Sequence, residues 1–519
     1  MRISQLLERA VQTKRDAVAT VYNDRQHTYG EFQDRVQRLA GALQKLGLEE
    51  GERAAILAQN SDRYLEFYYA VPWAGGVFVP VNTRLAVPEF AYWLNDSGSK
   101  ILFVDAAFAP AVPELLKQVE SLETVIYLGD DQTPEGMHAY EEILAAAEAV
   151  PDAGRKGDDL AGLFYTGGTT GVSKGVMLSH NNLVINSLNS MPAYGFTEQS
   201  VWLHAAPMFH IADGAAVFAA VLGLSKHVFI PGYTPEGTMQ AIELHGITET
   251  LLVPTMVNML VNHPKIRDYN LTSLINIVYG ASPMPEAVIV KALEELPGCG
   301  FTHAYGQTEC APLVTYTGPE FHVLDGPNAG RFKSAGRAAY SVDVKIFDEN
   351  DEEVPYGTVG QVCVQGDNVM LAYWNKPEQT AEALKGGWMH TGDGGYMDEQ
   401  GFVYIVDRVK DMIISGGENV YSAEVENTIY QHEAVAECAV IGIPSEKWGE
   451  QVHAIVRLHE GMTATEQDLI DFAHTLIAGF KCPRSVDFTT DPLPLSGAGK
   501  ILKTELRKPY WADQSKAVS

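Results

Sequence analysis

The sequence has few cysteines, and their spacing suggests no metal site. Five cysteines are scattered over 519 residues, an odd number without the paired spacing of zinc ligands. They also give no basis for a disulfide framework, so they are typical of a protein from a reducing compartment. We therefore expect a cytoplasmic protein. The cysteines are Cys299, Cys310, Cys363, Cys438 and Cys482.

Long apolar runs are missing as well. Residues 1–16 have the pattern of an amphipathic helix and lack the apolar centre of a signal peptide. The most apolar stretch near the middle, Gly214 to Leu224, is too short to cross a bilayer. The sequence therefore predicts no transmembrane segment.

The sequence has few basic residues. Lysine and arginine number 37 against 66 acidic residues, which gives a formal net charge of −29. Nucleic acids and anionic membranes are bound by basic surfaces, so this balance disfavours both as partners. If the ligands are anions, a few cations and backbone N–H groups have to offset a repulsive field.

What is present is a long chain of ordinary globular composition. Hydrophobic residues make up 46% and charged residues 20% of it. Its 519 residues exceed what one hydrophobic core serves, so two or more domains are expected. Through the first three-quarters, short apolar strands alternate with helices, such as the one that begins at the Thr28–Glu31 capping box and ends at Gly47. This alternation predicts an α/β fold with largely parallel sheets covered by helices.

The last part of the chain has a different pattern. Residues from about 334 to 406 read as short alternating strands with turns, which predicts a β-rich subdomain. A small α+β unit follows, with a helix after Ser422. We place the boundary between Asp407 and Asp411, within a charged segment. The predicted domains are residues 1–409 and 410–519.

A glycine- and threonine-rich motif, YTGGTTGVSKGVMLSH at residues 165–180, is the first strong chemical signal. Glycines after a strand allow a tight turn whose N–H groups and hydroxyls converge on phosphate oxygens, and Lys174 adds a compact positive charge. The glycine spacing differs from that of a P-loop. A flexible turn is the alternative, but the composition favours phosphate binding. The candidates are Thr166, Gly167, Gly168, Thr169, Thr170, Gly171 and Lys174.

This motif resembles the phosphate-loop signature YTSGTTGxPKG of the adenylate-forming (AMP-binding) superfamily, which includes acyl-CoA synthetases, carrier-protein adenylation domains and luciferases. Gly167 stands where the family usually has serine, which removes one hydroxyl, and Ser173 stands where it has proline. The resemblance covers nearly the whole chain, from about Thr28 to Lys503, because further motifs follow in the family's order. The acyl-CoA ligase branch fits best.

One of these motifs is PMFHIADG at residues 207–214. It resembles the segment whose histidine or aromatic side chain gates the acyl site. A lone histidine beside Met208 and Phe209 is otherwise more often a packed core residue. With the motif, the resemblance implies that His210 is a site residue.

Two further motifs resemble the nucleotide-binding segments of the family. GASP at residues 280–283 resembles the segment that lines the adenine, and AYGQTE at residues 304–309 resembles the family's YGxTE. The resemblance implies that Tyr305 stacks on adenine, that Thr308 binds a phosphate and that Glu309 holds Mg²⁺. A carboxylate suits this last role because a hard cation takes oxygen ligands. The other implied nucleotide-binding residues are Gly280, Ala281, Ser282 and Gly306.

The most family-specific run is GFVYIVDRVKDMIISGGENVYSAEVE at residues 401–426, preceded by HTGD at residues 390–393. The resemblance implies that Asp393 accepts from the ribose hydroxyls and that Arg408 reaches the ribose or a phosphate. Lys410 would be the hinge between the domains. The residues implied to approach the CoA thiol are Gly416, Gly417 and Glu418.

The last motif is PLPLSGAGKILK at residues 492–503, which resembles the family pattern PRTxSGKI. The resemblance implies that Lys500 reaches the reacting carboxylate, although a lysine near a C-terminus normally points into water. Leu495 stands where arginine or lysine is common, and Ser496 where threonine or asparagine is common. The missing charge at Leu495 concerns a secondary contact and leaves the role of Lys500 in place.

The resemblance as a whole implies an ATP-dependent acyl-CoA ligase. With ATP and Mg²⁺, a carboxylic acid would become its acyl-adenylate with release of pyrophosphate; the thiol of CoA would then take the acyl group and release AMP. Positioning and charge neutralisation would supply most of the catalysis. In the family a small, mobile C-terminal domain rotates about its hinge between the steps, which withdraws the lysine and brings in the glycine loop.

The sequence leaves the acid open. Small and apolar residues from His210 to Phe218 favour a fatty acid, with a hydroxycinnamate- or benzoate-type aromatic acid as the alternative. The runner-up activity is that of a stand-alone adenylation enzyme that loads a carrier protein. A luciferase-like monooxygenase fits less well, and intact Glu309, Asp393, Arg408 and Lys500 argue against a non-catalytic nucleotide sensor. A homodimer would be unsurprising.

Overall fold

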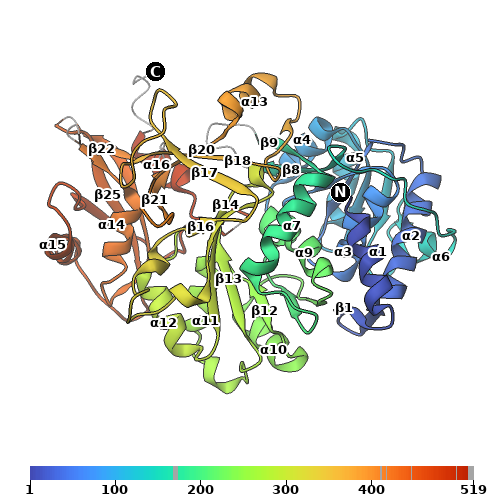
Figure 1. The fold of residues 1–519 in the computed structure, drawn as a ribbon, viewed down its shortest axis with the longest axis horizontal. Helices are drawn as coiled ribbons and strands as arrows, with labels where there is room; N and C mark the ends of the chain where they lie inside the picture. The colour runs from blue at the N-terminus through green and yellow to red at the C-terminus, as the bar shows by residue number, and fades with distance from the viewer. Residues whose placement is uncertain (167–172, 409–411, 416–417, 446, 498, 512–519) are drawn as a thin grey trace.

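The computed structural model describes the chain apart from residues 167–172, 409–411, 416–417, 446, 498 and 512–519. For Arg408 and Asn419 it describes the backbone alone. The described residues form four sheets. In Figure 1 the segments before α7 lie on one side of the molecule and the last sheet and its helices on the other.

The first large sheet has eight strands, in the order β19-β9-β8-β4-β3-β5-β6-β7. The five pairings from β8 to β7 in this order are parallel, whereas the pairings of β8 with β9 and of β9 with β19 are antiparallel. The strands are β3 (Arg53–Leu57), β4 (Val77–Pro80), β5 (Ser99–Val104), β6 (Thr124–Tyr127), β7 (His138–Ala139), β8 (Leu160–Thr166), β9 (Lys174–Ser179) and β19 (Ala372–Tyr373).

The second large sheet has nine strands, in the order β16-β15-β14-β13-β12-β10-β11-β1-β2. Its central strands run parallel, and antiparallel strands close both edges. The strands are β1 (Val18–Tyr22), β2 (Arg25–Thr28), β10 (Val201–His204), β11 (Lys226–Phe229), β12 (Glu249–Leu251), β13 (Asn276–Gly280), β14 (Gly300–Gly306), β15 (Leu313–Thr317) and β16 (Arg337–Ala338).

Helices connect these strands, as the alternation in the sequence predicts. The Thr28–Glu31 capping box is formed, since the Thr28 hydroxyl accepts from the Glu31 N–H at 3.2 Å, and the helix ends at Lys45. The helices are α1 (Ser4–Lys14), α2 (Tyr29–Lys45), α3 (Asp62–Trp73), α4 (Val87–Ser97), α5 (Val112–Gln118), α6 (Tyr140–Ala145), α7 (His180–Tyr194), α8 (Ile211–Gly214), α9 (Ala216–Leu222), α10 (Pro235–His245), α11 (Pro254–Val261), α12 (Glu286–Glu295) and α13 (Pro377–Ala383).

A third, antiparallel sheet of four strands matches the predicted β-rich subdomain. It consists of β17 (Val342–Phe347), β18 (Gly360–Gly366), β20 (Met389–Met397) and β21 (Val403–Arg408). The region predicted for it, residues 334–406, also sends β16 and β19 into the two large sheets. The subdomain is therefore joined to both sheets and is not a separate body.

The fourth sheet belongs to the C-terminal α+β unit and has five strands. They are β22 (Ile413–Ser415), β23 (Glu418–Val420), β24 (Val435–Ser445), β25 (Gly449–Leu458) and β26 (Ser485–Phe488), with helices α14 (Ser422–Ile429), α15 (Glu466–Leu476) and α16 (Lys503–Trp511). The predicted α/β fold class is thus confirmed. The division at residues 409 and 410 falls where the structure describes nothing and stays a prediction.

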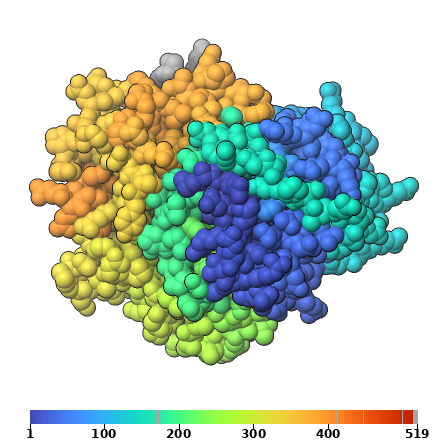
Figure 2. Space-filling model, turned by 45° about the vertical axis from the view of Figure 1, so that its right-hand side comes forward, coloured from blue at the N-terminus to red at the C-terminus, as the bar shows by residue number. Residues whose placement is uncertain are grey.

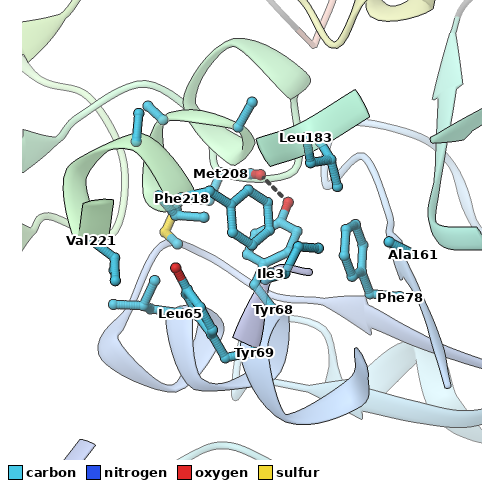
Figure 3. Packing of buried hydrophobic residues seen from close by; sticks show 14 of the residues in the cluster. Ile3, Leu65, Tyr68, Tyr69, Phe78, Ala161, Leu183, Met208, Phe218 and Val221 are labelled. Carbon is cyan, nitrogen blue, oxygen red and sulfur yellow. Dashed lines mark hydrogen bonds between the residues drawn. The ribbon is translucent and has the colours of Figure 1, made fainter. Parts of the chain in front are cut away.

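An aromatic core holds α3 against the large sheets (Figure 3). The ring of Tyr68 lies 5.0 Å from that of Phe78 on β4 and 5.8 Å from that of Phe218 on α9, measured between centroids. Its hydroxyl donates to the Met208 carbonyl at 2.6 Å. This bond ties the core to the segment that leads into His210.

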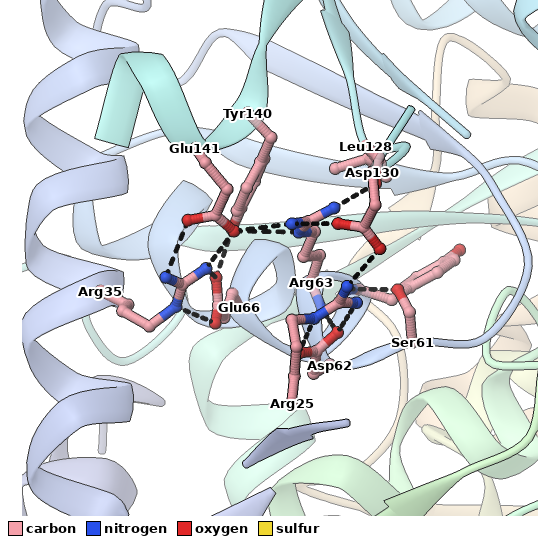
Figure 4. A network of polar contacts seen from close by, with 11 residues as sticks. Arg25, Arg35, Ser61, Asp62, Arg63, Glu66, Leu128, Asp130, Tyr140 and Glu141 are labelled. Atoms are coloured by element: carbon pink, nitrogen blue, oxygen red, sulfur yellow. Dashed lines mark hydrogen bonds and ion pairs between the residues drawn. The ribbon is translucent and has the colours of Figure 1, made fainter. Parts of the chain in front are cut away.

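A partly buried network of charged side chains joins α2, α3 and α6 (Figure 4). We call it the arginine network. Arg35 contacts Glu66 at 2.6 Å, and Arg63 contacts Glu141 at 2.8 Å. Almost every member has two or more partners, so the network forms a mesh. Its members are Arg25, Arg35, Asp62, Arg63, Glu66, Asp130, Tyr140 and Glu141.

Helix α1 lies on the surface beside segments from later in the chain, where it is the dark blue element of Figure 2. Arg9 donates to the Leu222 carbonyl at the end of α9 at 2.8 Å, and the N–H of Ile3 donates to His180 at 3.3 Å. The predicted amphipathic helix is therefore part of the fold. No helix among the described residues is long and apolar enough to cross a membrane.

Candidate active site

The glycine- and threonine-rich motif lies at the end of the β8–β9 hairpin. Thr166 and Lys174 are paired in the antiparallel register, so they flank the connecting segment. The five predicted phosphate-binding residues between them lie outside the described residues. They are Gly167, Gly168, Thr169, Thr170 and Gly171.

Tyr373 connects two of the predicted site residues. The Nζ of Lys174 lies 4.6 Å from the centroid of the Tyr373 ring, and the Tyr373 hydroxyl donates to Oε1 of Glu309 at 2.7 Å. Burial raises the pKa of Tyr373, with the Glu309 carboxylate acting in the same direction, so the phenol stays protonated and keeps donating. Glu309 itself is buried in a short 3₁₀ turn, Thr308–Cys310, with Thr308 beside it.

Tyr373 is a residue that sequence reasoning missed. It lies on β19, a strand of only two residues that pairs with β9 nearly two hundred positions earlier in the chain. No local pattern reveals such a pairing. An aromatic pair, Tyr373 and Trp374, next to a turn was the only hint, and aromatic pairs of this kind are common in cores.

The ends of β13 and β14 bring the predicted adenine segments together. Gly280 faces Ala304 in the parallel register, and a Cβ on Gly280 would lie 2.1 Å from the Ala304 carbonyl oxygen. A Cβ on Gly306 would lie 1.8 Å from the Pro312 carbonyl oxygen, so both glycines are required by close backbone approach. Ala281 has φ +69°, a left-handed conformation that costs energy for a residue with a side chain. Ser282 follows it at the end of the strand.

Tyr305 and Asp393 also meet. The Tyr305 hydroxyl donates to Oδ2 of Asp393 at 2.8 Å, and the Asp393 N–H donates to Thr391 at 3.0 Å. Burial, followed by the Asp393 carboxylate, raises the pKa of Tyr305, so this phenol remains a donor too. Asp393 faces Arg408 in the β20–β21 register, and the side chain of Arg408 lies outside what is described.

His210 begins α8, and its Nδ1 accepts from the Ala212 N–H at 3.3 Å. Burial lowers the pKa of His210 to about 3, and the positive charge of Lys500 acts in the same direction. The imidazole is therefore neutral at physiological pH. The charge of Lys500 thus acts on a residue 290 positions earlier in the chain. The contact of Lys500 with the reacting carboxylate, which the resemblance implies, stays a prediction.

The loop that carries Lys500 is held by contacts to the large domain. Arg84 Nη1 donates to the Ser496 carbonyl at 2.9 Å, and the Thr255 hydroxyl donates to the Gly499 carbonyl at 3.3 Å. Inside the loop, the Ser496 hydroxyl accepts from the Lys500 N–H at 3.1 Å. Ser496, which departs from the family pattern, thus accepts a hydrogen bond within the loop, whereas the side chain of Leu495 is exposed.

Of the residues predicted to approach the CoA thiol, the structure describes only Glu418. Glu418 is an exposed residue of β23, an edge strand that pairs with β22. In the described part of the chain it takes part in none of the site contacts given above. Gly416, Gly417 and the predicted hinge Lys410 lie outside the described residues.

Among the described residues, no group of three or more histidine, cysteine, aspartate or glutamate side chains could hold a metal ion. Glu309 would therefore offer a single carboxylate. Such a residue suits an ion like Mg²⁺, which is commonly bound by one or two carboxylates together with substrate phosphates.

Comparison with known proteins agrees with this geometry. The AMP-binding enzyme family matches residues 7–374, and the AMP-binding enzyme C-terminal domain matches residues 424–500. A feruloyl-CoA synthase from Amycolatopsis is 39% identical over 93% of this chain and 94% of its own length. The fatty acid–[acyl-carrier-protein] ligase ScoC from Streptomyces coeruleorubidus is 35% identical over 96% and 95%. The crystal structure of ATP-bound MatB from Rhodopseudomonas palustris is 31% identical, with a TM-score of 0.88 over 99% of this chain and 100% of that one.

Proposed function

The chain belongs to the AMP-binding enzyme family, and on that premise we propose that it is an ATP-dependent acyl-CoA ligase. It activates a carboxylic acid as the acyl-adenylate with release of pyrophosphate, and then transfers the acyl group to the thiol of CoA with release of AMP. The observation that carries the proposal is the docking of the Lys500 loop on the large domain, where Arg84 donates to Ser496 and Thr255 donates to Gly499. In this arrangement the positive charge of Lys500 also acts on His210 of the predicted acyl site.

In the first step the acid's carboxylate attacks the α-phosphorus of ATP, and two anions have to approach each other. Lys174 and Lys500 supply positive charge at this point. His210 is neutral, so it adds an apolar edge and a hydrogen-bonding nitrogen without a competing charge. Such preorganised charge is worth most when it is fixed before the reaction begins.

Glu309 would hold Mg²⁺ on the phosphates. The ion would spread the charge of the triphosphate and favour departure of pyrophosphate. The hydroxyl of Tyr373 occupies Oε1 of Glu309 and leaves Oε2 for other ligands. Because the same ring lies under Lys174, Tyr373 sets the carboxylate and the lysine relative to each other.

The nucleotide would lie along the ends of β13 and β14. There Gly280, Ala281 and Ser282 would line the adenine beside Tyr305, and Gly306 would allow close approach of the backbone. Asp393, with Arg408 opposite it in the register, would accept from the ribose hydroxyls. Thr308 and the segment from Thr166 to Gly171 would bind the phosphates. Since Tyr305 donates to Asp393, the residue proposed to contact adenine is hydrogen-bonded to the residue proposed to contact the ribose.

In the second step the C-terminal domain, residues 410–519, would rotate about Lys410. The rotation would withdraw Lys500 and bring Gly416, Gly417 and Glu418 toward the acyl-adenylate. The docked Lys500 loop and the exposed position of Glu418 support this account because they suit the first step.

For the acid we propose an apolar monocarboxylate, with a fatty acid first and a hydroxycinnamate-type acid as the alternative. The apolar sequence from His210 to Phe218 supports both, because an apolar acyl pocket suits either acid. The aromatic alternative gains weight from the similarity to a feruloyl-CoA synthase. A carrier protein in place of CoA is a second candidate acceptor, favoured by the similarity to a fatty acid–carrier-protein ligase.

The test is pyrophosphate release with ATP and Mg²⁺ across fatty, short-chain and aromatic acids, with and without CoA. Continuous turnover that needs CoA supports the ligase and ranks the acids in one experiment. A single stoichiometric burst that CoA does not extend would favour carrier-protein loading. No release with any acid would contradict the proposal.

A further inference from the structure

Four polar residues connect the last strand of the large domain with the C-terminal unit. They are Asp407 on β21, Ser422 and Glu426 on α14, and Lys503 at the start of α16; we call them the interdomain cluster. Asp407 precedes the predicted hinge, and the other three follow it. The cluster therefore bridges the two parts of the chain that the proposed function requires to move.

The contacts in this cluster connect all four residues. Oδ2 of Asp407 accepts from the N–H of Ser422 at 2.6 Å and from its hydroxyl at 2.7 Å. The same hydroxyl accepts from Nζ of Lys503 at 2.5 Å, and Nζ contacts Glu426 at 2.7 Å. Asp407 is only 8% exposed and Ser422 is fully buried, so water competes little for these bonds.

The cluster lies between two functional elements. On one side, Asp407 faces Gly394 in the β20–β21 register, next to Asp393, which holds Tyr305. On the other side, Lys503 follows Lys500 by three positions in the chain. Lys503 donates to Ser422, and Ser422 donates to Asp407. These bonds hold the C-terminal end of the Lys500 loop, which we call its base.

We propose that Asp407 is a positioning residue for Lys500 in the first step of the reaction. The Lys500 loop is held at its tip by Arg84 and Thr255, and at its base by the Ser422–Asp407 bonds. Both attachments join the C-terminal unit to the large domain. Rotation about the hinge breaks both, so Asp407 favours adenylation and does not contribute to thioester formation. This inference rests on the proposed two-step function.

The experiment compares Asp407→Ala, Asp407→Asn and Ser422→Ala with the wild type in separate half-reactions. Acyl-adenylate formation should fall about tenfold in Asp407→Ala, the size expected for losing charge-assisted hydrogen bonds. Thioester formation from supplied acyl-adenylate should stay at the wild-type rate. Asp407→Asn keeps an oxygen acceptor and should recover part of the loss. Ser422→Ala removes a single hydroxyl, which the fold tolerates best, and should show the same split with a smaller loss.

Hydrogen–deuterium exchange of the enzyme without substrates gives a readout that needs no activity. Residues 82–85, 253–257 and 495–501 should exchange faster in Asp407→Ala and Ser422→Ala, because the docked loop is released. Glu353→Ala is the control, since its exposed pair with Lys345 lies in the β-rich sheet region away from the boundary.

A split between the half-reactions together with faster exchange supports the inference. Equal loss in both half-reactions, or wild-type exchange in all three segments, overturns it. If the wild type forms no acyl-adenylate with any acid, the proposed function fails. The exchange data then decide alone whether Asp407 holds the Lys500 loop.

Discussion

The arginine network and the interdomain cluster are built from the same kinds of side chain but are connected differently. In the arginine network, Arg25 contacts both Asp62 and Asp130, Arg63 also contacts Asp130, and the Arg63 N–H donates to Asp62, so these bonds form a closed mesh within the N-terminal part (Figure 4). In the interdomain cluster the contacts run from Asp407 to Ser422 and on to Lys503 and Glu426, and they cross the domain boundary.

The difference concerns what each arrangement resists. A mesh keeps most of its contacts when one is lost, so it suits a part of the protein that stays rigid. The interdomain cluster instead crosses the boundary, where Ser422 on α14 donates twice to Asp407 on β21, so it lies at contacts that a moving domain would have to break. Buried charges therefore stabilise a domain in one place and define a separable contact in the other.

Removing the Lys500 side chain should give the largest loss in the rate of acyl-adenylate formation. Because the interdomain cluster is proposed to act through Lys500, variants of the cluster should lose less. Lys500→Ala should lower acyl-adenylate formation by on the order of 10²–10³, the usual effect of losing a preorganised charge at the transition state. Thioester formation from supplied acyl-adenylate should remain. Both rates are measured by quenched-flow assays of the separate steps, and equal loss in both would contradict the domain-rotation account.

Removing one arginine of the arginine network should lower the free energy of unfolding and leave the ratio of the two half-reaction rates unchanged. Arg35→Ala leaves Glu66, whose side chain is 1% exposed, with Tyr140 as its remaining polar partner, at a cost of about 3 kcal/mol of unfolding free energy. Denaturant titration measures this loss. Lys117→Ala, in an exposed pair on α5, is the matched control and should unfold like the wild type. A changed ratio of half-reaction rates in Arg35→Ala would show that the mesh also serves catalysis.

Restricting the backbone at the domain boundary should slow thioester formation more than adenylation, which is the reverse of the effect expected for Asp407→Ala. Lys410→Pro restricts the backbone at the proposed hinge, so thioester formation should fall by about tenfold or more while adenylation changes less. Single-turnover assays of each step measure this. Normal rates in both would remove Lys410 as the hinge.

The smallest effect should appear at His210. Its pKa, lowered to about 3, lies below the value of about 6.5 of an unfolded histidine. The neutral ring therefore contributes its full stability above about pH 6.5, and this contribution is lost as the pH falls toward 3. In Lys500→Met the pKa of His210 should move upward, because one positive charge is removed. An NMR titration of the ring protons measures it, with Lys508→Met as control, and an unchanged pKa would show that Lys500 lies elsewhere.

Much of the fold could be predicted because its signals are local. The capping box at Thr28, the apolar strands and the helices after Ser61 and Ser422 depend on neighbouring residues, and the structure has them where the sequence indicates. The role of Lys500 was implied by resemblance, and no local pattern shows that its loop bonds Arg84 and Thr255 of the large domain.

The contacts missed by sequence reasoning are long-range pairings of polar groups. Tyr373 meets Glu309 through a strand pairing set by the whole sheet. Asp407 was recognised only as part of a boundary, since a carboxylate before a hinge gives no sign of the serine it binds fifteen residues later. The bond of Arg84 to Ser496 depends on how the C-terminal unit docks, which no local pattern shows.

The two-residue strand β19 also has a consequence for synthesis of the protein. Strand β9 pairs with β8 on one side and with β19 on the other, so its second edge has no partner until residue 373 has left the ribosome. Chains begin to fold from the N-terminus during translation, and an unpaired edge strand can associate with other chains. The nascent protein is therefore most vulnerable to aggregation in this interval, and any fragment that stops before Ala372 lacks the tyrosine that sets Lys174 against Glu309.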